Sequence, residues 1–402
     1  MDEGIALMIL LVGSFVALSF ILRMLLTKMH IPVLVGYIAI GFATKWLDVH
    51  YHFLEGHILH PIEFLAEAGI ILLLFRVGLE SNINDLIEQL PRASNIWFWN
   101  VVVSGSVGFV TSFYILGINL IPSLFVATAL TATSIGVSVA LWKEEKILNT
   151  KKGQLMLDVA ELDDLSSIAI LALLISIAPV LAGNGETLSM TSIGKTAGIF
   201  TITFVAFAAF CAFFSLKIEP RISKFVMARQ TDHEPMMMII STGFIIAALA
   251  ELLGLSLTIG AFFAGLAFSR DTAMIKCEMC YKPLYEFFVP FFFIGIGLQI
   301  DPTLLSEAFT MGLILLIAAI VGKVVGTGGA AIPYVGLSGA AIIGVSMVPR
   351  AEIAMIVMQK GLTLGDWAVP QDVFAAMVVV VAGTTLLTPF ALDWLLKKRI
   401  TS

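Results

Sequence analysis

Residues 31–41 read IPVLVGYIAIG, and residues 255–265 read LSLTIGAFFAG. Both stretches are apolar, and both have glycines at the sixth and eleventh positions. A second match follows in the same order, between FRVGLE at residues 75–80 and IGIGLQ at residues 294–299. Close helix packing alone explains one match of small residues. Two matches in the same order predict an internal repeat.

The repeat lies in a chain that is too apolar for a water-soluble protein. Of its 402 residues, 59 % are hydrophobic and 13 % are charged, against about 25 % charged in a typical soluble domain. Mean hydropathy is +0.99. These values exclude a soluble enzyme, a disordered protein and a nucleic-acid binder, and they predict a multi-pass protein in a lipid bilayer. Continuous apolar runs exclude an outer-membrane barrel.

Apolar segments of about the length needed to cross 30 Å of hydrocarbon follow one another along the chain. We count thirteen, at about residues 5–22, 31–47, 62–80, 95–116, 120–141, 153–178, 196–216, 235–253, 255–269, 284–300, 308–333, 337–360 and 371–396. The N-terminus lacks the basic residues of a signal peptide, so we expect the first segment to remain as a helix. The fold class predicted is an all-α membrane protein with about 13 transmembrane helices and no soluble regulatory domain.

The charged loops orient these segments. With the N-terminus outside and the C-terminus in the cytoplasm, 17 basic residues fall in inner loops and 3 in outer loops. This asymmetry is typical of a multi-pass protein of the cytoplasmic (inner) membrane. The two copies begin at the second and the ninth segments, which are seven apart. Because seven is odd, the second copy is inverted in the membrane. Inverted repeats are typical of secondary transporters with alternating access.

Charged residues inside the segments indicate where function resides, because each costs about 2.5–3.5 kcal/mol at the centre of a span. They are Asp158, Glu161, Asp163 and Asp164 in segment 153–178, Lys323 in segment 308–333, and Arg350 and Glu352 in segment 337–360. Asp163 and Asp164 point about 100° apart on a helix, so they cannot share one proton. Lys323 can neutralise one of them, which leaves the other to bind a proton or a small cation such as Na⁺. The alternative, a charge pair that only joins two helices, leaves one acid unexplained.

Two segments are predicted to be interrupted within the membrane. Hydroxyl groups lie mid-span in one, where unwound backbone offers oxygens to a cation, and a proline breaks the other. The residues are Thr131, Thr133 and Ser134 in the first, and Pro349, Arg350 and Glu352 in the second. Arg350 and Glu352 either pair with each other or neutralise the two half-helix ends. A packing kink is the alternative for each segment.

Four motifs together resemble the monovalent cation/proton antiporters, and among them the NapA-type sodium/proton antiporters, which are related to the Kef potassium efflux systems. The motifs are LDD at 162–164, TATSIG at 131–136, GKVVG at 322–326 and MVPRAE at 347–352. The resemblance implies a homodimer with an NhaA/NapA-like fold, in which a core moves like an elevator against a scaffold. The implied core helices lie at about 62–178 and 284–360, and the scaffold helices at about 5–47, 196–269 and 371–396.

The resemblance also implies roles for the charged residues. Asp164 corresponds to the carboxylate that binds the cation or the proton, and Asp163 to the acid that pairs with Lys323. A double acid marks electrogenic members, which exchange two protons for one sodium. Asp158 and Glu161 depart from the pattern and are candidates for an auxiliary relay. The implied protein is a Na⁺(Li⁺)/H⁺ antiporter, not an enzyme, and it has no cofactor besides the transported ions.

Other functions stay open. Potassium/proton exchange of the Kef type uses the same fold, and oxygen ligands suit both cations. A passive cation channel would need a file of sites, where the sequence shows one, and a membrane sensor could keep the fold without exchange. A membrane-embedded enzyme would need a nucleophile with a base, or a metal set, and no histidine lies within a predicted span.

Two weaker patterns lie in predicted loops. Four histidines occur together in an outer loop, and two of the three cysteines form a Cys-x-x-Cys pair in an inner loop. They are His50, His52, His57, His60, Cys277 and Cys280. The histidines could tune activity near neutral pH or bind a metal, although a solvated loop explains them as well. The cysteine pair has no second pair to complete a metal site.

Overall fold

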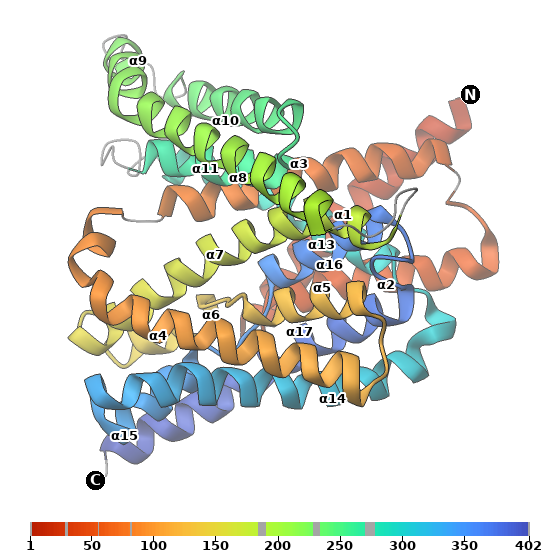
Figure 1. Cartoon of the computed structure of the whole chain (residues 1–402). Coiled ribbons are helices and arrows are strands. Elements are labelled where there is room, and N and C mark those ends of the chain that lie inside the picture. Colours follow the sequence, from red (N-terminus) through yellow and green to blue (C-terminus); the bar gives the residue numbers. More distant parts are fainter. Residues whose placement is uncertain are drawn as a thin grey trace. The chain divides into compact units, whose positions relative to one another are not determined.

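The computed structural model of the chain describes residues 2–28, 31–54, 56–80, 83–183, 190–227, 234–269 and 278–400. Within these ranges it is built from helices, with no β-strand (Figure 1). Seven helical stretches are long and apolar enough to cross a membrane, and shorter apolar helices accompany them. The prediction of an all-α, multi-pass membrane protein is confirmed.

The chain divides into two compact units that interleave in sequence. The first unit comprises Met1–Leu25, Gly36–Asn84 and Gly185–Leu298, and the second comprises Leu26–Val35, Asp85–Asn184 and Gln299–Ser402. Most of the first unit is formed by α1 (Asp2–Lys28), α2 (Val33–Tyr51), α3 (Gly56–Glu80), α8 (Met190–Phe213), the short π-helix η2 (Phe214–Ile218), α9 (Glu219–Met227), α10 (Glu234–Leu252), α11 (Leu257–Phe268) and α13 (Glu278–Leu298).

Glycines of the predicted repeat bring helices of the first unit into backbone contact. A Cβ atom at Gly41 of α2 would overlap the backbone of α13 at Gly297, and a Cβ atom at Gly265 of α11 would overlap the backbone of α3 beside Gly78. The sequence match pairs Gly41 with Gly265 and Gly78 with Gly297. Replacing each glycine by its match therefore turns the contact of Gly41 with Gly297 into the contact of Gly265 with Gly78. This correspondence supports the prediction of an internal repeat.

We expect Gly265→Ala to destabilise the protein by about 1–3 kcal/mol, because an added methyl group would collide with the carbonyl oxygen of Phe75. Gly198→Ala is the matched control, since nothing lies within 4 Å of the Cβ position there. In a helix interior that change is expected to stabilise by about 0.5–1 kcal/mol. Thermal unfolding of both variants in one detergent measures the difference, and equal melting temperatures would contradict the close contact.

The second unit holds the two interrupted helices. Its elements are α4 (Ile83–Val110), the short π-helix η1 (Thr111–Ile115), α5 (Leu120–Thr131), α6 (Gly136–Glu144), α7 (Lys151–Leu181), the 3₁₀ turn η3 (Pro302–Leu304), α14 (Leu305–Lys323), the short π-helix η4 (Val324–Gly328), α15 (Gly329–Ser346), α16 (Glu352–Leu364) and α17 (Gln371–Ile400). The apolar stretch Pro302–Ser346 has 45 residues. At 1.5 Å per residue it would be about 67 Å long, far more than one crossing needs. Gly336, with φ of 71°, divides it into two parts.

Both predicted interruptions are present and they meet. Non-helical segments separate α5 from α6 at residues 132–135, and α15 from α16 at residues 347–351. Pro349 has no N–H to continue a helix, and its carbonyl accepts a hydrogen bond of 2.9 Å from the Ser134 backbone N–H. Two broken helices thus cross within the second unit.

The compact units differ from the core and scaffold ranges expected from the sequence. Helices α3 and α13 belong to the first unit, although residues 62–80 and 284–300 were expected in the core. Helix α17 belongs to the second unit, although 371–396 was expected in the scaffold. Glycine contacts give the reason, since α3 packs on α11 and α13 packs on α2. Helix α17 packs on α14, where a Cβ at Gly312 would lie 2.6 Å from Val379. Which unit moves stays a prediction.

Candidate functional site

The two adjacent acids lie on α7 in different surroundings. Thr150 caps the first turn of this helix by accepting a 3.3 Å hydrogen bond from the Gly153 N–H. Asp163 is completely buried, whereas Asp164 is half-buried. Because neighbouring residues point in different directions on a helix, the two carboxylates face different partners.

Asp163 is held by three side chains that donate to it. Lys323 Nζ lies 2.8 Å from Asp163 Oδ2, and both side chains are fully buried. Thr133 Oγ1 donates to the same oxygen at 2.7 Å. Asn100 Nδ2 lies 2.7 Å from Oδ1 and 2.6 Å from Oδ2. All of these contacts are made by donors, so the hydrogen-bonding capacity of the buried Asp163 carboxylate is well satisfied.

Asn100 was not singled out by the sequence reasoning, yet it is central to this network. Its Oδ1 accepts hydrogen bonds from Thr327 at 2.7 Å and from Ser104 at 3.2 Å, which directs its amide group toward Asp163. Small residues allow this approach, because a Cβ at Gly326 would lie only 3.1 Å from the Asn100 Cα. The available signal was an amide inside the apolar segment 95–116, whose other asparagine, Asn95, lies at the first position of the segment.

Two buried cations meet the C-terminal end of α5. Lys323 Nζ donates to the carbonyl oxygen of Thr131 at 2.7 Å, and Arg350 Nη1 donates to the carbonyl oxygen of Ala132. The last carbonyls of a helix have no partner within the helix and form its negative end. Lys323 and Arg350 therefore compensate the interruption of α5.

Glu352 lies at the N-terminal, positive end of a half-helix, in contrast to Lys323 and Arg350 at a C-terminal end. It is the first residue of α16, where exposed N–H groups favour a negative charge. Its Oε2 accepts a 2.8 Å hydrogen bond from Ser134 Oγ, which joins the two interruptions. The Arg350 N–H donates to Thr384 Oγ1 of α17 at 3.1 Å. Of the two arrangements open on the sequence, the structure has Arg350 and Glu352 at separate half-helix ends.

Asp164 contrasts with its neighbour. Among the residues that the structure describes, Asp164 Oδ1 is buried and has no hydrogen-bond partner. A buried carboxylate oxygen without a donor is costly, and either a proton or a cation would relieve that cost. Asp164 is thus the acid best placed to bind an exchangeable ion.

The remaining predicted hydroxyl, Thr131 Oγ1, donates to Thr128 O at 2.7 Å and lies 3.3 Å from Ser167 Oγ.

The other predicted residues make none of the contacts described above, or their side chains lie outside the part of the chain that the structure describes. Asp158 and Glu161 precede the acids on α7, and Asp158 is only 8 % exposed. Their relay role stays a prediction. The prediction of a histidine loop is wrong for His50, which lies on α2, and for His60, which lies on α3 and pairs with Glu63 at 3.2 Å in an exposed position. The positions outside the described side chains are His57, Cys277 and Cys280. Within the described residues, no group of three or more His, Cys, Asp or Glu could hold a metal ion.

Comparisons with known proteins cover nearly the whole chain. The family model described as the transmembrane sodium/hydrogen exchanger matches residues 14–398. The high-affinity Na⁺/H⁺ antiporter NhaS3 of Synechocystis is 31 % identical over 82 % of this chain and 70 % of its own length. The Na⁺/H⁺-K⁺ antiporter GerN of Bacillus cereus is 30 % identical over 81 % of each chain. The structure of the sodium proton antiporter MjNhaP1 from Methanocaldococcus jannaschii has a TM-score of 0.71 and 14 % identity, covering 98 % of this chain and 99 % of that one.

Proposed function

Because the chain belongs to the sodium/hydrogen exchanger family, we propose that it exchanges Na⁺ (or Li⁺) for H⁺ across a membrane, with Asp164 binding each ion in turn. The observation that carries this proposal is the contrast on α7. Asp163 has donors from three side chains, whereas Asp164 Oδ1 is buried without a hydrogen-bond partner among the described residues. Competition of Na⁺ and H⁺ for one carboxylate is sufficient for exchange.

We further propose that the Asp163–Lys323 ion pair breaks when the cation enters. Lys323 then loses a proton, which together with the proton displaced from Asp164 would make two protons for one Na⁺. Net charge would move, so exchange would be electrogenic. Asn100 and Thr133 would still donate to Asp163 after Lys323 leaves, so its carboxylate would keep hydrogen-bond partners beside the incoming cation.

The fold suits this function at a coarser level. Broken helices near the bilayer midplane are typical of transporters in which one body moves against another around a fixed site. We propose an elevator motion of a core against a scaffold, a homodimer, and insertion in the cytoplasmic membrane with the N-terminus outside. These follow the resemblance and the loop charges.

Potassium/proton exchange is the second candidate, and the name of GerN supports it, since that relative is called a Na⁺/H⁺-K⁺ antiporter. Oxygen ligands serve both cations, so the residues do not separate the two. A passive channel is less well supported, because a channel needs a file of sites, whereas the charged residues of this site gather where the two interrupted helices meet.

Proton flux in proteoliposomes tests the proposal. Na⁺ and Li⁺ are added to vesicles whose membrane potential is set by valinomycin and a K⁺ gradient, and K⁺ is tested without the ionophore. We expect Na⁺ and Li⁺ to drive proton movement at a rate that changes with the imposed potential. A response to K⁺ alone would favour the second candidate. A response to Na⁺ that ignores the potential would contradict electrogenic exchange.

A further inference from the structure

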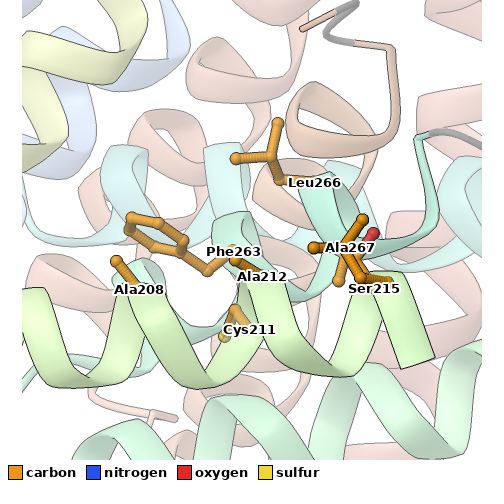
Figure 2. A pocket seen from close by; sticks show the side chains of 8 residues that line it. Ala208, Cys211, Ala212, Ser215, Phe263, Leu266 and Ala267 are labelled. Carbon is orange, nitrogen blue, oxygen red and sulfur yellow. The ribbon is translucent and has the colours of Figure 1, made fainter. Parts of the chain in front are cut away.

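A groove lies between α8 and α11 in the first unit. Its volume is about 310 Å³, at the lower end of the range of about 300–1,000 Å³ for small-ligand sites. Small side chains of α8 and η2 form one wall and larger apolar side chains of α11 form the other (Figure 2). The wall residues include Ala208, Cys211, Ala212 and Ser215 on one side, and Phe263 and Leu266 on the other.

The groove follows the axis of α8. Its small residues are three or four positions apart, so they form one stripe along about two turns of the helix. Figure 2 shows Ala208 and Phe263 at one end, and Ser215 with Ala267 at the other. Leu216 at the rim is 54 % exposed. In a membrane-spanning helix, such a stripe opens toward lipid and runs in the direction of an acyl chain.

One polar group beside the groove lacks a partner. Ser215 lines the groove and is 8 % exposed, and among the described residues its buried Oγ makes no hydrogen bond. A serine hydroxyl in an apolar helix usually bonds to a carbonyl one turn earlier, and an unsatisfied hydroxyl in hydrocarbon is costly. When the side chain rotates into the groove, the ester carbonyl of a phospholipid is an acceptor that would satisfy the hydroxyl at this end of the groove.

Basic residues continue from the same end. Helix α8, η2 and α9 form one uninterrupted helix from residue 190 to 227. Lys217, Arg221 and Lys224 are exposed, and their spacing of four and three residues puts them on one face. The acidic residue within this stretch, Glu219, is 3 % exposed and does not share that surface. Such a stripe attracts the phosphate of anionic lipids.

We propose that the α8–α11 groove binds one acyl chain of an anionic phospholipid, with Ser215 Oγ donating to the ester carbonyl and Lys217, Arg221 and Lys224 contacting the phosphate. The apolar wall, the unpartnered hydroxyl and the basic stripe occur in this order along one helix. This is the order of acyl chain, ester and phosphate in a phospholipid. The inference does not depend on the proposed exchange function.

Native mass spectrometry of the full chain in detergent, with added phosphatidylglycerol or phosphatidylcholine, tests the proposal. We expect a phosphatidylglycerol adduct that survives delipidating detergent. A208L/A212L fills the groove and should reduce its occupancy about fivefold or more. K217Q/R221Q/K224Q should weaken phosphatidylglycerol binding about tenfold and leave the weaker phosphatidylcholine binding unchanged.

Two matched control variants make the same kinds of substitution at positions outside the proposed lipid site. A206L/A209L enlarges exposed alanines of α8 that do not line the groove, and K143Q/K146Q/K151Q removes three exposed basic residues of the second unit. Both controls should keep the adduct. Equal losses in the controls and the groove variants would overturn the proposal. It would also fail if A208L/A212L changed only the ratio of monomer to dimer, because a second copy of the chain would then occupy the groove.

Discussion

Asp164→Asn is expected to abolish cation-dependent proton flux, down to the level of vesicles without protein. Asparagine keeps the size of the side chain and removes both the negative charge and the titratable proton. A neutral amide can neither compensate Na⁺ nor release H⁺ in exchange for it. The variant should still fold, because Asp164 Oδ1 makes no hydrogen bond among the described residues that the change would break. Fluorescent proton-flux traces, normalised to reconstituted protein, measure the loss.

Asp393→Asn is the matched control for this variant. It also removes one carboxylate from the second unit, but Asp393 is exposed on α17 and pairs with Lys397 at 2.7 Å. We expect its flux to stay near that of the unchanged protein. Sodium-dependent proton flux in the Asp164→Asn vesicles would remove the basis for assigning ion binding to Asp164.

The parts of the structure that sequence reasoning predicts are those that local chemistry determines. Continuous apolar runs predict membrane-spanning helices. Backbone N–H and C=O groups without hydrogen-bond partners are costly in hydrocarbon, and a helix pairs them with one another. Pro349 predicts an interruption, because it has no N–H to donate. Charges within apolar segments identify Asp163 and Lys323 as important, since burying them is costly without a partner.

The parts that it misses depend on the approach of distant helices. Asn100 and Thr327 are 227 residues apart, and only the packing of α14 and η4 against α4 joins them in a hydrogen bond. Asn100 is a polar residue in an apolar segment, but nothing in that segment shows that Thr327 is its partner. The same reason explains the division of helices between the units, because glycine contacts such as Gly78 with α11 decide which helices pack together. Spacing shows that these glycines repeat, but not which partner each one contacts.

Lys323→Ala is expected to lower stability by about 3–5 kcal/mol as well as to slow exchange. Removing one partner of a buried ion pair leaves the other charge uncompensated, and Asp163 is completely buried. The same change removes the donor to the carbonyl of Thr131 at the end of α5. Chemical or thermal unfolding in detergent, together with flux per reconstituted protein, measures both effects. An alanine variant as stable as the unchanged protein would show that the pair contributes nothing to the fold.

A double variant separates the uncompensated charge from simple loss of packing. In D163N/K323A no charge remains at the pair, so most of the stability lost in Lys323→Ala should return, whereas exchange should stay impaired. Asn100→Ala gives the complementary comparison, because it removes the amide donor to Asp163 and keeps the ion pair. Loss of the amide that donates to both oxygens of Asp163 is expected to cost about 1.5–3 kcal/mol, less than loss of the lysine. If the double variant were as unstable as Lys323→Ala, the cost would come from packing around the lysine stem, and charge compensation would not be the reason that Lys323 is buried beside Asp163.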